Sequence, residues 1–393
     1  MRAPVQPPVH LTYCLNVHAG ERFHDQWTAV RGCATEVRDR LGITEPFGLG
    51  LRIGARALAE LQSGTLADDF GVWCRDHGFY VFTLNGFPFG AFHGQPVKSA
   101  VYRPDWTDPR RRDYTMGLAD VLSKWLPSGM VGSISTVPGW YAPDYTRAGD
   151  RAAARQRAGQ HLGDVARHLD KLAESTGAEI RLGLEPEPWC ALESSADAID
   201  FLGEFFAGGA GSEEGVRRRR VGVCLDTCHC ALADESPASA IAALRANGIA
   251  LVKTQLSAAL SVRPEAGWRK AWAQFIEPVY LHQTVVGSPG AWRRFVDLDA
   301  AISACDDPPD WEEARTHFHV PLHWAGSAPI YSTGSNMDES FWREITAGGC
   351  PHLEIETYTF AVLPEGVGEN RLSESLSWEY RWVLDRLASI LSA

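Results

Sequence analysis

The chain has no excess of positive charge and no long apolar run. Its 37 Lys and Arg residues face 49 Asp and Glu residues, which gives a formal net charge of -12. Nucleic-acid-binding surfaces usually carry a basic patch or stripe, so this composition argues against such a partner. The sequence also lacks a run of about 18 apolar residues that could span a bilayer, and it lacks a signal-peptide pattern at its start. We therefore expect a cytoplasmic protein without a transmembrane segment.

The nine cysteines form neither a disulfide framework nor a zinc motif. Their number is odd and their positions are scattered, so disulfide pairing is not expected. Cys224, Cys228 and Cys230 lie close in sequence but lack the paired C-x2-C spacing of a structural zinc site. The basic run Arg217 to Arg220 follows a Gly-rich acidic segment, and this charge pattern predicts a solvated loop.

Short β-rich runs alternate with helical stretches from about residue 10 to the end of the chain. This order predicts an α/β fold, a (β/α)8 TIM barrel that forms a single domain over residues 1–393. Nine candidate strands compete for eight barrel positions: 10–16, 47–53, 80–84, 131–137, 179–185, 220–226, 249–255, 316–322 and 352–358. Helices are predicted at 151–175, 196–206, 237–246 and 373–391.

Two segments exceed the length of an ordinary loop between a strand and a helix. Residues 86–109 are rich in Gly, Pro and aromatics, and residues 256–313 contain a strand-like run at 277–283. Long loops on a compact domain are usually lids or binding loops. We therefore expect an inserted segment between late strands, at about 256–315, and a covered barrel mouth.

Four apolar, strand-like runs end on a carboxylate or an amide: Glu185, Asp226, Gln255 and Glu356. Parallel-barrel enzymes place their catalytic groups at the C-terminal ends of strands. Side chains alternate along a strand, so packing the leucines of 181–185 outward turns Glu185 inward. The same alternation turns Asp226 and Glu356 inward, which predicts that the three acids share one interior site.

Buried carboxylates without a partner are costly, so this site needs a compensating positive charge. A divalent cation, Mn, Mg, Zn or Co, would supply it. Arg52 and Lys253 are also predicted to point inward and could instead pair with Glu185 and Asp226 as a structural network. His229 follows Asp226 by three residues; it could orient a substrate hydroxyl or move a proton, or it could be ordinary polar surface.

At these residues the chain resembles the xylose-isomerase-like TIM barrels, a superfamily that includes sugar isomerases, ketose 3-epimerases and endonuclease-IV-type enzymes. Its epimerase-like members hold a metal by Glu, Asp, His and Glu from late strands. The resemblance implies a metal site made of Glu185, Asp226, Gln255 and Glu356, with Gln255 where histidine is usual. It also implies that His229 contacts the substrate.

A narrower resemblance covers nearly the whole chain. The chain is similar to the EboE-type metabolite traffic proteins of bacterial ebo gene clusters, through segments 11–21, 253–257, 280–283, 317–321 and 352–359. It implies a role in moving a metabolite toward the cell envelope, with partners among the ebo-cluster proteins. In the run 316–322, His317 and His319 share one face, so His319 could replace the missing histidine ligand or could pack as core in the insertion.

Together these patterns favour a metal-dependent isomerase or epimerase of a sugar-like, polyhydroxylated small metabolite. Glu185 and Glu356 would act as general base and acid. Two alternatives stay open: a non-catalytic metabolite-binding or carrier barrel, and an endonuclease-IV-like phosphoester hydrolase. Aromatic residues near the expected mouth, Phe87, Phe92 and Tyr358 among them, could stack on a planar or prenylated metabolite or serve only as packing. The candidate substrate contacts are His18, Arg52, Asn85, His229, Lys253 and His319.

Overall fold

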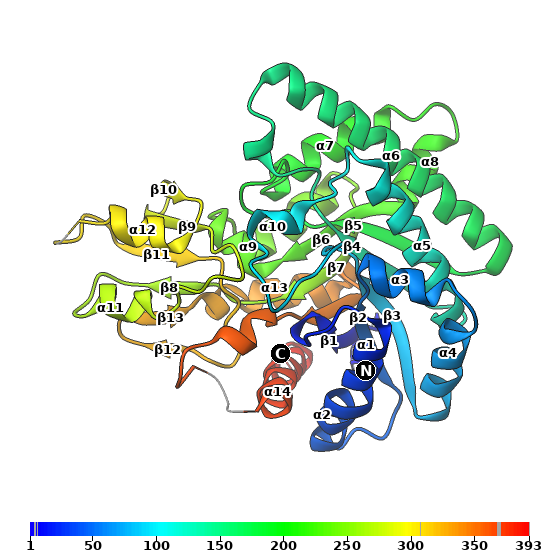
Figure 1. The fold of residues 1–393 in the computed structure, drawn as a ribbon, viewed down its shortest axis with the longest axis horizontal. Coiled ribbons are helices and arrows are strands. Elements are labelled where there is room, and N and C mark those ends of the chain that lie inside the picture. Colours follow the sequence, from blue (N-terminus) through cyan, green and yellow to red (C-terminus); the bar gives the residue numbers. More distant parts are fainter. Residues whose placement is uncertain (4, 6, 307, 368–370, 393) are drawn as a thin grey trace.

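Eight parallel strands form a nearly closed barrel at the centre of the structure, which is a computed structural model (Figure 1). It describes residues 1–3, 5, 7–306, 308–367 and 371–392. Around the barrel the strand order is β1-β14-β7-β6-β5-β4-β3-β2. The seam between β1 and β2 is bridged by the parallel pair Cys14 and Gly50. The predicted (β/α)8 barrel is therefore confirmed.

The barrel strands are β1 (His10–Tyr13), β2 (Phe47–Arg52), β3 (Phe79–Asn85), β4 (Val131–Thr136), β5 (Glu179–Leu184), β6 (Val221–Asp226), β7 (Leu251–Leu256) and β14 (His352–Ile355). The helices that surround them are α1 (Phe23–Ala29), α2 (Thr35–Leu41), α3 (Ala55–Leu61), α4 (Leu66–Asp76), α5 (Pro109–Trp125), α6 (Ala148–Thr176), α7 (Ser195–Ala207), α8 (Glu213–Arg220), α9 (Thr227–Leu232), α10 (Pro237–Ala246), α13 (Glu339–Glu344) and α14 (Leu372–Ser392).

Side-chain alternation sorts the barrel strands into an outer apolar face and an inner polar face. On β5, Leu182 and Leu184 are fully buried in the hydrophobic core, while Glu185, directly after the strand, lines the cavity at the barrel mouth. Inside the barrel, Gly50 makes room for an acid: a Cβ atom there would lie 1.8 Å from Oε1 of Glu354. Glycine at this position is thus required by the packing of a buried carboxylate.

A second sheet projects from one side of the barrel (Figure 1). Its strands are β8 (Leu260–Val262), β9 (Thr284–Ser288), β10 (Ala291–Phe295), β11 (Glu313–Thr316), β12 (Gly326–Ser327) and β13 (Ile330–Ser332), and helices α11 (Trp268–Ala273) and α12 (Leu298–Ala304) accompany them. All of its pairings are antiparallel, in the order β10-β9-β11-β8-β13-β12. The chain therefore leaves the barrel after β7 and returns to it for β14.

Three predictions of local structure were wrong. Residues 317–321 form no strand, because β11 ends at Thr316 and the chain then turns inward as an irregular segment. The run 277–283 is not a strand either; β9 begins only at Thr284. The expected basic loop is the end of helix α8, where Arg220 is buried and forms ion pairs with Asp170 and Glu179.

No helix within the described ranges is both long enough and apolar enough to cross a membrane. The longest, α6, carries charged residues along its whole length.

Candidate active site

Three buried carboxylates meet at the mouth of the barrel. Glu185 follows β5, Asp226 ends β6 and Glu356 follows β14. One oxygen from each of them lies within 4.8 Å of the other two. The structure therefore brings together the three acids that side-chain alternation turned inward.

Asp226 is anchored through one oxygen and leaves the other one free. Its Oδ1 accepts hydrogen bonds from the backbone N–H groups of Cys228 and His229, at 2.7 and 3.1 Å, and from the Ser257 hydroxyl. Asp226 thus caps the N-terminus of α9. Its Oδ2 is buried without a hydrogen-bond partner among the described residues and lies 4.0 Å from Nε2 of His319.

Glu356 is oriented in a similar way by two amides. Its Oε1 accepts hydrogen bonds from Nδ2 of Asn16 at 2.7 Å and from Nδ2 of Asn85 at 3.1 Å. Glu185 turns a buried Oε2 into the interior, and this oxygen has no hydrogen-bond partner in the part of the chain that the structure describes. Each of the three acids is held by its strand, and at least two of them present an unpaired oxygen.

His319 presents an unprotonated ring nitrogen to the same carboxylate site. Its Nδ1 lies 2.8 Å from the backbone oxygen of Glu356, which can only accept, so Nδ1 carries the proton of the neutral ring. Nε2 is then a free lone pair, and it is buried without a partner within the described ranges. Histidines that bind metal ions typically donate their other ring N–H to such an oxygen, which fixes the tautomer.

Gln255 lies on β7, directly beside Asp226 in the strand register. It is fully buried, and neither atom of its amide has a hydrogen-bond partner among the residues described. An unsatisfied buried amide costs free energy unless it binds something else. Its amide oxygen could therefore serve as an additional ligand.

The basic residues that might have neutralised these acids pair elsewhere. Nζ of Lys253 lies 2.5 Å from Oε2 of Glu354, and both side chains are fully buried inside the barrel. Both terminal nitrogens of Arg52 bind Glu21, at 3.1 and 2.9 Å. The structural network considered for Arg52 and Lys253 is therefore not the one observed, and neither side chain lines the cavity.

Burial and mutual repulsion perturb the titration of this site. Burial, with the negative charges of Asp226 and Glu187 added, raises the pKa of Glu185 well above its ordinary value. Burial and the charge of Glu185 do the same to the pKa of Glu356. Burial would also raise the pKa of Asp226, but His229, His319 and the hydrogen bonds to Oδ1 hold it below its ordinary value. The surroundings therefore favour the protonated forms of Glu185 and Glu356 and the ionised form of Asp226.

A second set of ligand atoms lies beside the first. Nδ1 of His229 is 2.8 Å from the Pro186 carbonyl oxygen, and Nδ1 of His317 is 2.8 Å from Oε1 of Gln283, so both Nδ1 atoms donate. The two Nε2 atoms then face each other as lone pairs only 3.2 Å apart, a contact that requires a shared proton or cation. Together with Glu187, whose ligand atom lies within 4.8 Å of theirs, they could hold a cation.

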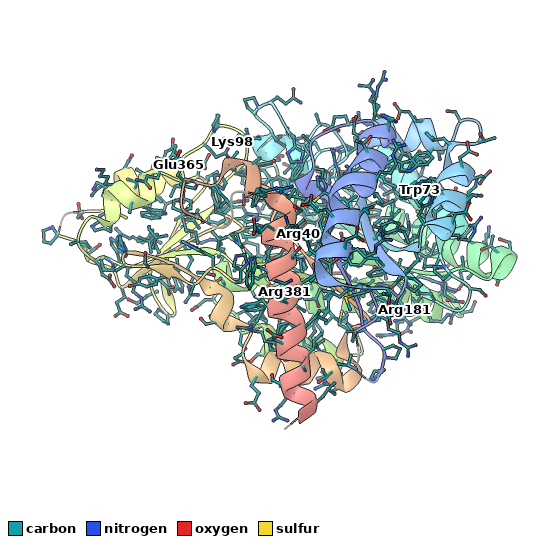
Figure 2. The ribbon with its side chains drawn as sticks, turned by 90° about the horizontal axis from the view of Figure 1, so that it is seen from below. Arg40, Trp73, Lys98, Arg181, Glu365 and Arg381 are labelled. Atoms are coloured by element: carbon teal, nitrogen blue, oxygen red, sulfur yellow. The ribbon has the colours of Figure 1, made fainter. Side chains whose placement is uncertain are left out.

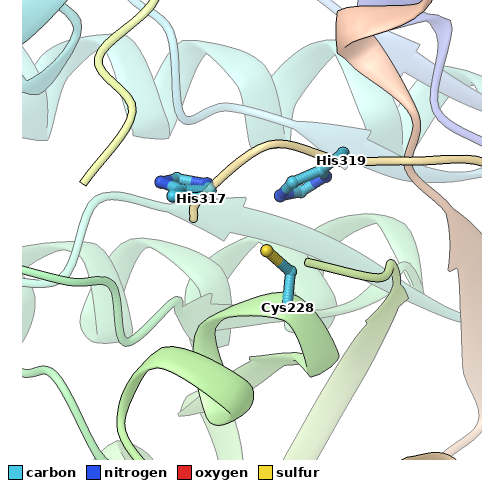
Figure 3. Close-up of side chains that lie close together, drawn as sticks. All are labelled: Cys228, His317 and His319. Carbon is cyan, nitrogen blue, oxygen red and sulfur yellow. The ribbon is translucent and has the colours of Figure 1, made fainter. Parts of the chain in front are cut away.

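The Cys228 thiol adds a soft donor to this region. Figure 3 shows its sulfur directed from α9 toward His317 and His319, which lie on one irregular segment. The three ligand atoms lie within 4.8 Å of one another. Burial raises the pKa of the Cys228 thiol well above its usual range, so the metal-free protein keeps it protonated.

The remaining candidates have distinct positions. Asn85 lines the mouth cavity, whereas His18 lies outside its lining and is bonded through Nε2 to the Tyr13 hydroxyl at 2.9 Å. Asn16 and Glu187 also line the cavity but were not predicted as site residues. Their positions near strand ends could have indicated them, because Asn16 follows the first strand and Glu187 comes two residues after Glu185.

A family model described as xylose isomerase-like TIM barrel matches residues 51–270. The chain belongs to this xylose isomerase-like TIM barrel family. The structure of this chain is similar to that of a D-tagatose 3-epimerase-like protein, with a TM-score of 0.53 and 10% sequence identity. The match covers 98% of this chain and 99% of the other one.

A xylose isomerase-like TIM barrel protein from Mycobacterium smegmatis, in complex with magnesium, is similar with a TM-score of 0.53 and 13% identity, over 98% of each chain. At such identities the two structures show a shared fold and nothing finer. Among curated proteins, no match was found.

Proposed function

We propose that this xylose isomerase-like barrel is a metal-dependent isomerase or epimerase of a polyhydroxylated small metabolite. The observation that carries the proposal is the convergence of unpaired donor atoms at the mouth: Oε2 of Glu185, Oδ2 of Asp226 and Nε2 of His319 are buried without partners in the described part of the chain. Such a mixed oxygen and nitrogen set suits a divalent cation. Glu356 completes the set, and Gln255 is a further candidate.

A divalent cation at this position would polarise adjacent carbonyl and hydroxyl oxygens of the substrate and make the carbon-bound proton between them more acidic. Glu185 and Glu356 lie on strands separated by β6 and β7, so they approach a substrate from different sides. Burial raises the pKa of both carboxyls in the metal-free protein, and each of them can act as a general base or acid. We assign them the exchange of the substrate proton, with Asn16 and Asn85 positioning Glu356.

Around this centre we assign substrate contacts to His229, His319 and Asn85. Lys253 and Arg52 act from further away, by neutralising Glu354 and Glu21. We also propose that residues 1–393 work as one barrel domain, with the side sheet as its insertion.

Proton exchange can be tested without knowing the product. The protein should be incubated with Mg²⁺, Mn²⁺, Zn²⁺ or Co²⁺ and a panel of aldoses, ketoses and cyclic polyol ketones in D₂O. We expect one class to gain a deuteron at the carbon beside its carbonyl, detected by mass spectrometry, and a chelator should abolish the exchange. Absence of deuterium from every member that binds would contradict the proposal.

A second candidate is a metabolite carrier without turnover. Gln255, where the resemblance leads us to expect histidine, favours it, as does the similarity to the EboE-type metabolite traffic proteins. In this role the protein would take up a metabolite in the cytoplasm and pass it to ebo-cluster partners. Tight binding of a metabolite that returns unchanged and undeuterated after long incubation would support the carrier over the isomerase.

A further inference from the structure

The cavity above the carboxylates has an apolar roof. Phe92, Val97, Tyr280 and Tyr358 form a small hydrophobic cluster of their own, separate from the main core, and all four line the cavity. They come from three places: the segment after β3, the segment before β9 and the segment after β14. The roof is therefore assembled where barrel loops meet the insertion, directly over a floor of acids and histidines.

The aromatic rings of this roof are fixed by one another. The ring centroids of Phe92 and Tyr280 lie 5.2 Å apart, those of Phe92 and Tyr358 lie 5.4 Å apart, and those of Tyr280 and Tyr358 lie 4.9 Å apart. Such tilted and edge-on contacts are favourable arrangements for aromatic pairs. The three rings thus form a preorganised surface.

The tyrosine hydroxyls around the cavity are already used by the protein. The Tyr280 hydroxyl lies 2.7 Å from Nδ1 of His93. The Tyr102 hydroxyl donates to Glu187 at 2.6 Å and accepts from Nε2 of Gln283 at 2.7 Å. With their polar ends occupied, these side chains offer a ligand mainly ring carbon.

The lining also lacks a free cation for an anionic substituent. Lys98 is the one Lys or Arg among the described residues of the lining, and its Nζ binds Asp297 at 2.7 Å and the Glu277 carbonyl oxygen at 3.4 Å. Its side chain is 35% exposed and lies near the upper border of the molecule as seen in Figure 2. A phosphate or carboxylate in the cavity would instead face Glu185 and Glu187, with no unpaired Lys or Arg among the described lining residues to compensate the loss of its hydration.

We infer that the ligand of this cavity is an uncharged polyol or sugar that carries an apolar ring or chain. Its hydroxylated end lies against the carboxylates and its apolar part lies beneath Phe92, Tyr280 and Tyr358. The orientation of the hydroxylated end rests on the proposed function, because it assumes a cation held by the acids. The apolar contact and the exclusion of anions follow from the roof and from Lys98.

Calorimetric binding in the presence of Mg²⁺ or Zn²⁺ tests the inference. Glucose, galactose and mannose are each tested as the free sugar, as the methyl, phenyl and octyl glycosides, and as the 6-phosphate. We expect at least about 10-fold tighter binding of a phenyl than of the matching methyl glycoside, the gain expected for burying one ring. The 6-phosphate should bind more weakly than the free sugar.

The variant Phe92→Leu should lose most of the phenyl gain, so that phenyl and methyl glycosides bind it with similar affinity. Phe89→Leu is the matched control, because Phe89 lies in the same loop, packs on Tyr114 and does not line the cavity. Tighter binding of the phosphate, equal binding of phenyl and methyl glycosides, or no binding of any probe at millimolar concentration would overturn the inference. These readouts need no turnover, so a carrier that fails the deuterium test can still show the phenyl gain.

Discussion

Two groups of buried acids lie inside the same barrel, and they differ in what neutralises them. Glu354, deep in the barrel, binds Lys253 at 2.5 Å, and both side chains are fully excluded from solvent. Burial alone would lower the pKa of Lys253, but the carboxylate beside it holds that pKa above its ordinary value. Glu185, Asp226 and Glu356 lie one level higher, with no Lys or Arg among the described residues within ion-pair distance.

This difference indicates that the paired acid supports the structure of the barrel, whereas the three unpaired acids are available for function. The two charges of a buried ion pair neutralise each other, and removing one partner is destabilising because it leaves the other charge buried and unpaired. Buried acids without a cationic side chain must keep a proton or bind a cation, and the proposed function assigns them a cation. Four experiments can break or sharpen this contrast.

The largest effect is expected from Glu185→Gln and Glu356→Gln. Each variant loses a carboxylate that can accept a proton, so proton exchange on the accepted substrate should fall by about 100- to 10,000-fold. Deuterium incorporation measures it. The control is Glu379→Gln, a buried carboxyl that accepts hydrogen bonds from Thr357 and Leu322 outside the cavity. Undiminished exchange in both site variants would show that these acids do not move the proton.

Removing one partner of the deep pair should mainly affect stability. Lys253→Met leaves Glu354 buried without its cation, and we expect the free energy of unfolding to fall by about 3–5 kcal/mol. Urea unfolding measures it. The double variant Lys253→Met/Glu354→Gln removes the unpaired charge and should recover part of the loss. Equal stabilities of single and double variants would mean that the pair is not what holds this part of the barrel.

Once a chelator has removed the metal, the unpaired acids should make the stability of the protein depend on pH. In the metal-free folded protein the pKa values of Glu185 and Glu356 are raised, so the folded state binds more protons than the unfolded state. Stability should therefore decrease as pH rises from about 6.5 to 8, by at most about 1.4 kcal/mol per pH unit for each acid. Unfolding at several pH values measures the slope.

Glu185→Gln should flatten that slope, and a divalent cation should remove it, because metal-bound carboxylates are ionised like their unfolded counterparts. Above about pH 7 the buried histidines contribute little, because burial lowers the pKa of His319 to about 4 and an unfolded histidine, with a pKa of about 6.5, is already mostly neutral. A slope unaffected by both changes would place the titrating groups elsewhere.

The smallest effect is expected at Gln255. Gln255→Leu removes a candidate ligand oxygen but no hydrogen bond, so metal affinity should fall about 10-fold, or about 1.4 kcal/mol, without loss of stability in the metal-free protein. Competition with a metal-sensitive dye measures the affinity. Gln26→Leu is the matched control, a buried amide on α1 that likewise lacks partners among the described residues. Equal metal affinity of the Gln255 variant and wild type would exclude the amide as a ligand.

Local sequence patterns were sufficient to predict the barrel strands and the inward direction of the three acids. Strands and side-chain alternation depend on neighbouring residues, so the eight barrel strands and the inward direction of Glu185, Asp226 and Glu356 could be read along the chain. The same local rule failed at 316–322, where alternating histidines look like a strand. Strand formation there would need a partner edge, and the chain past Thr316 has none in the side sheet.

Only the tertiary structure determines which charged side chains come into contact. The pairing of Lys253 with Glu354 joins two strands at positions 101 residues apart in sequence. The approach of His319 to Asp226 depends on the insertion folding back over the mouth. Sequence shows that a residue can ligate or pair, because that is a property of its side chain. Distances between elements depend on how the whole barrel closes. That closure brings Lys253 to Glu354 and leaves Glu185, Asp226 and Glu356 without a Lys or Arg beside them among the described residues.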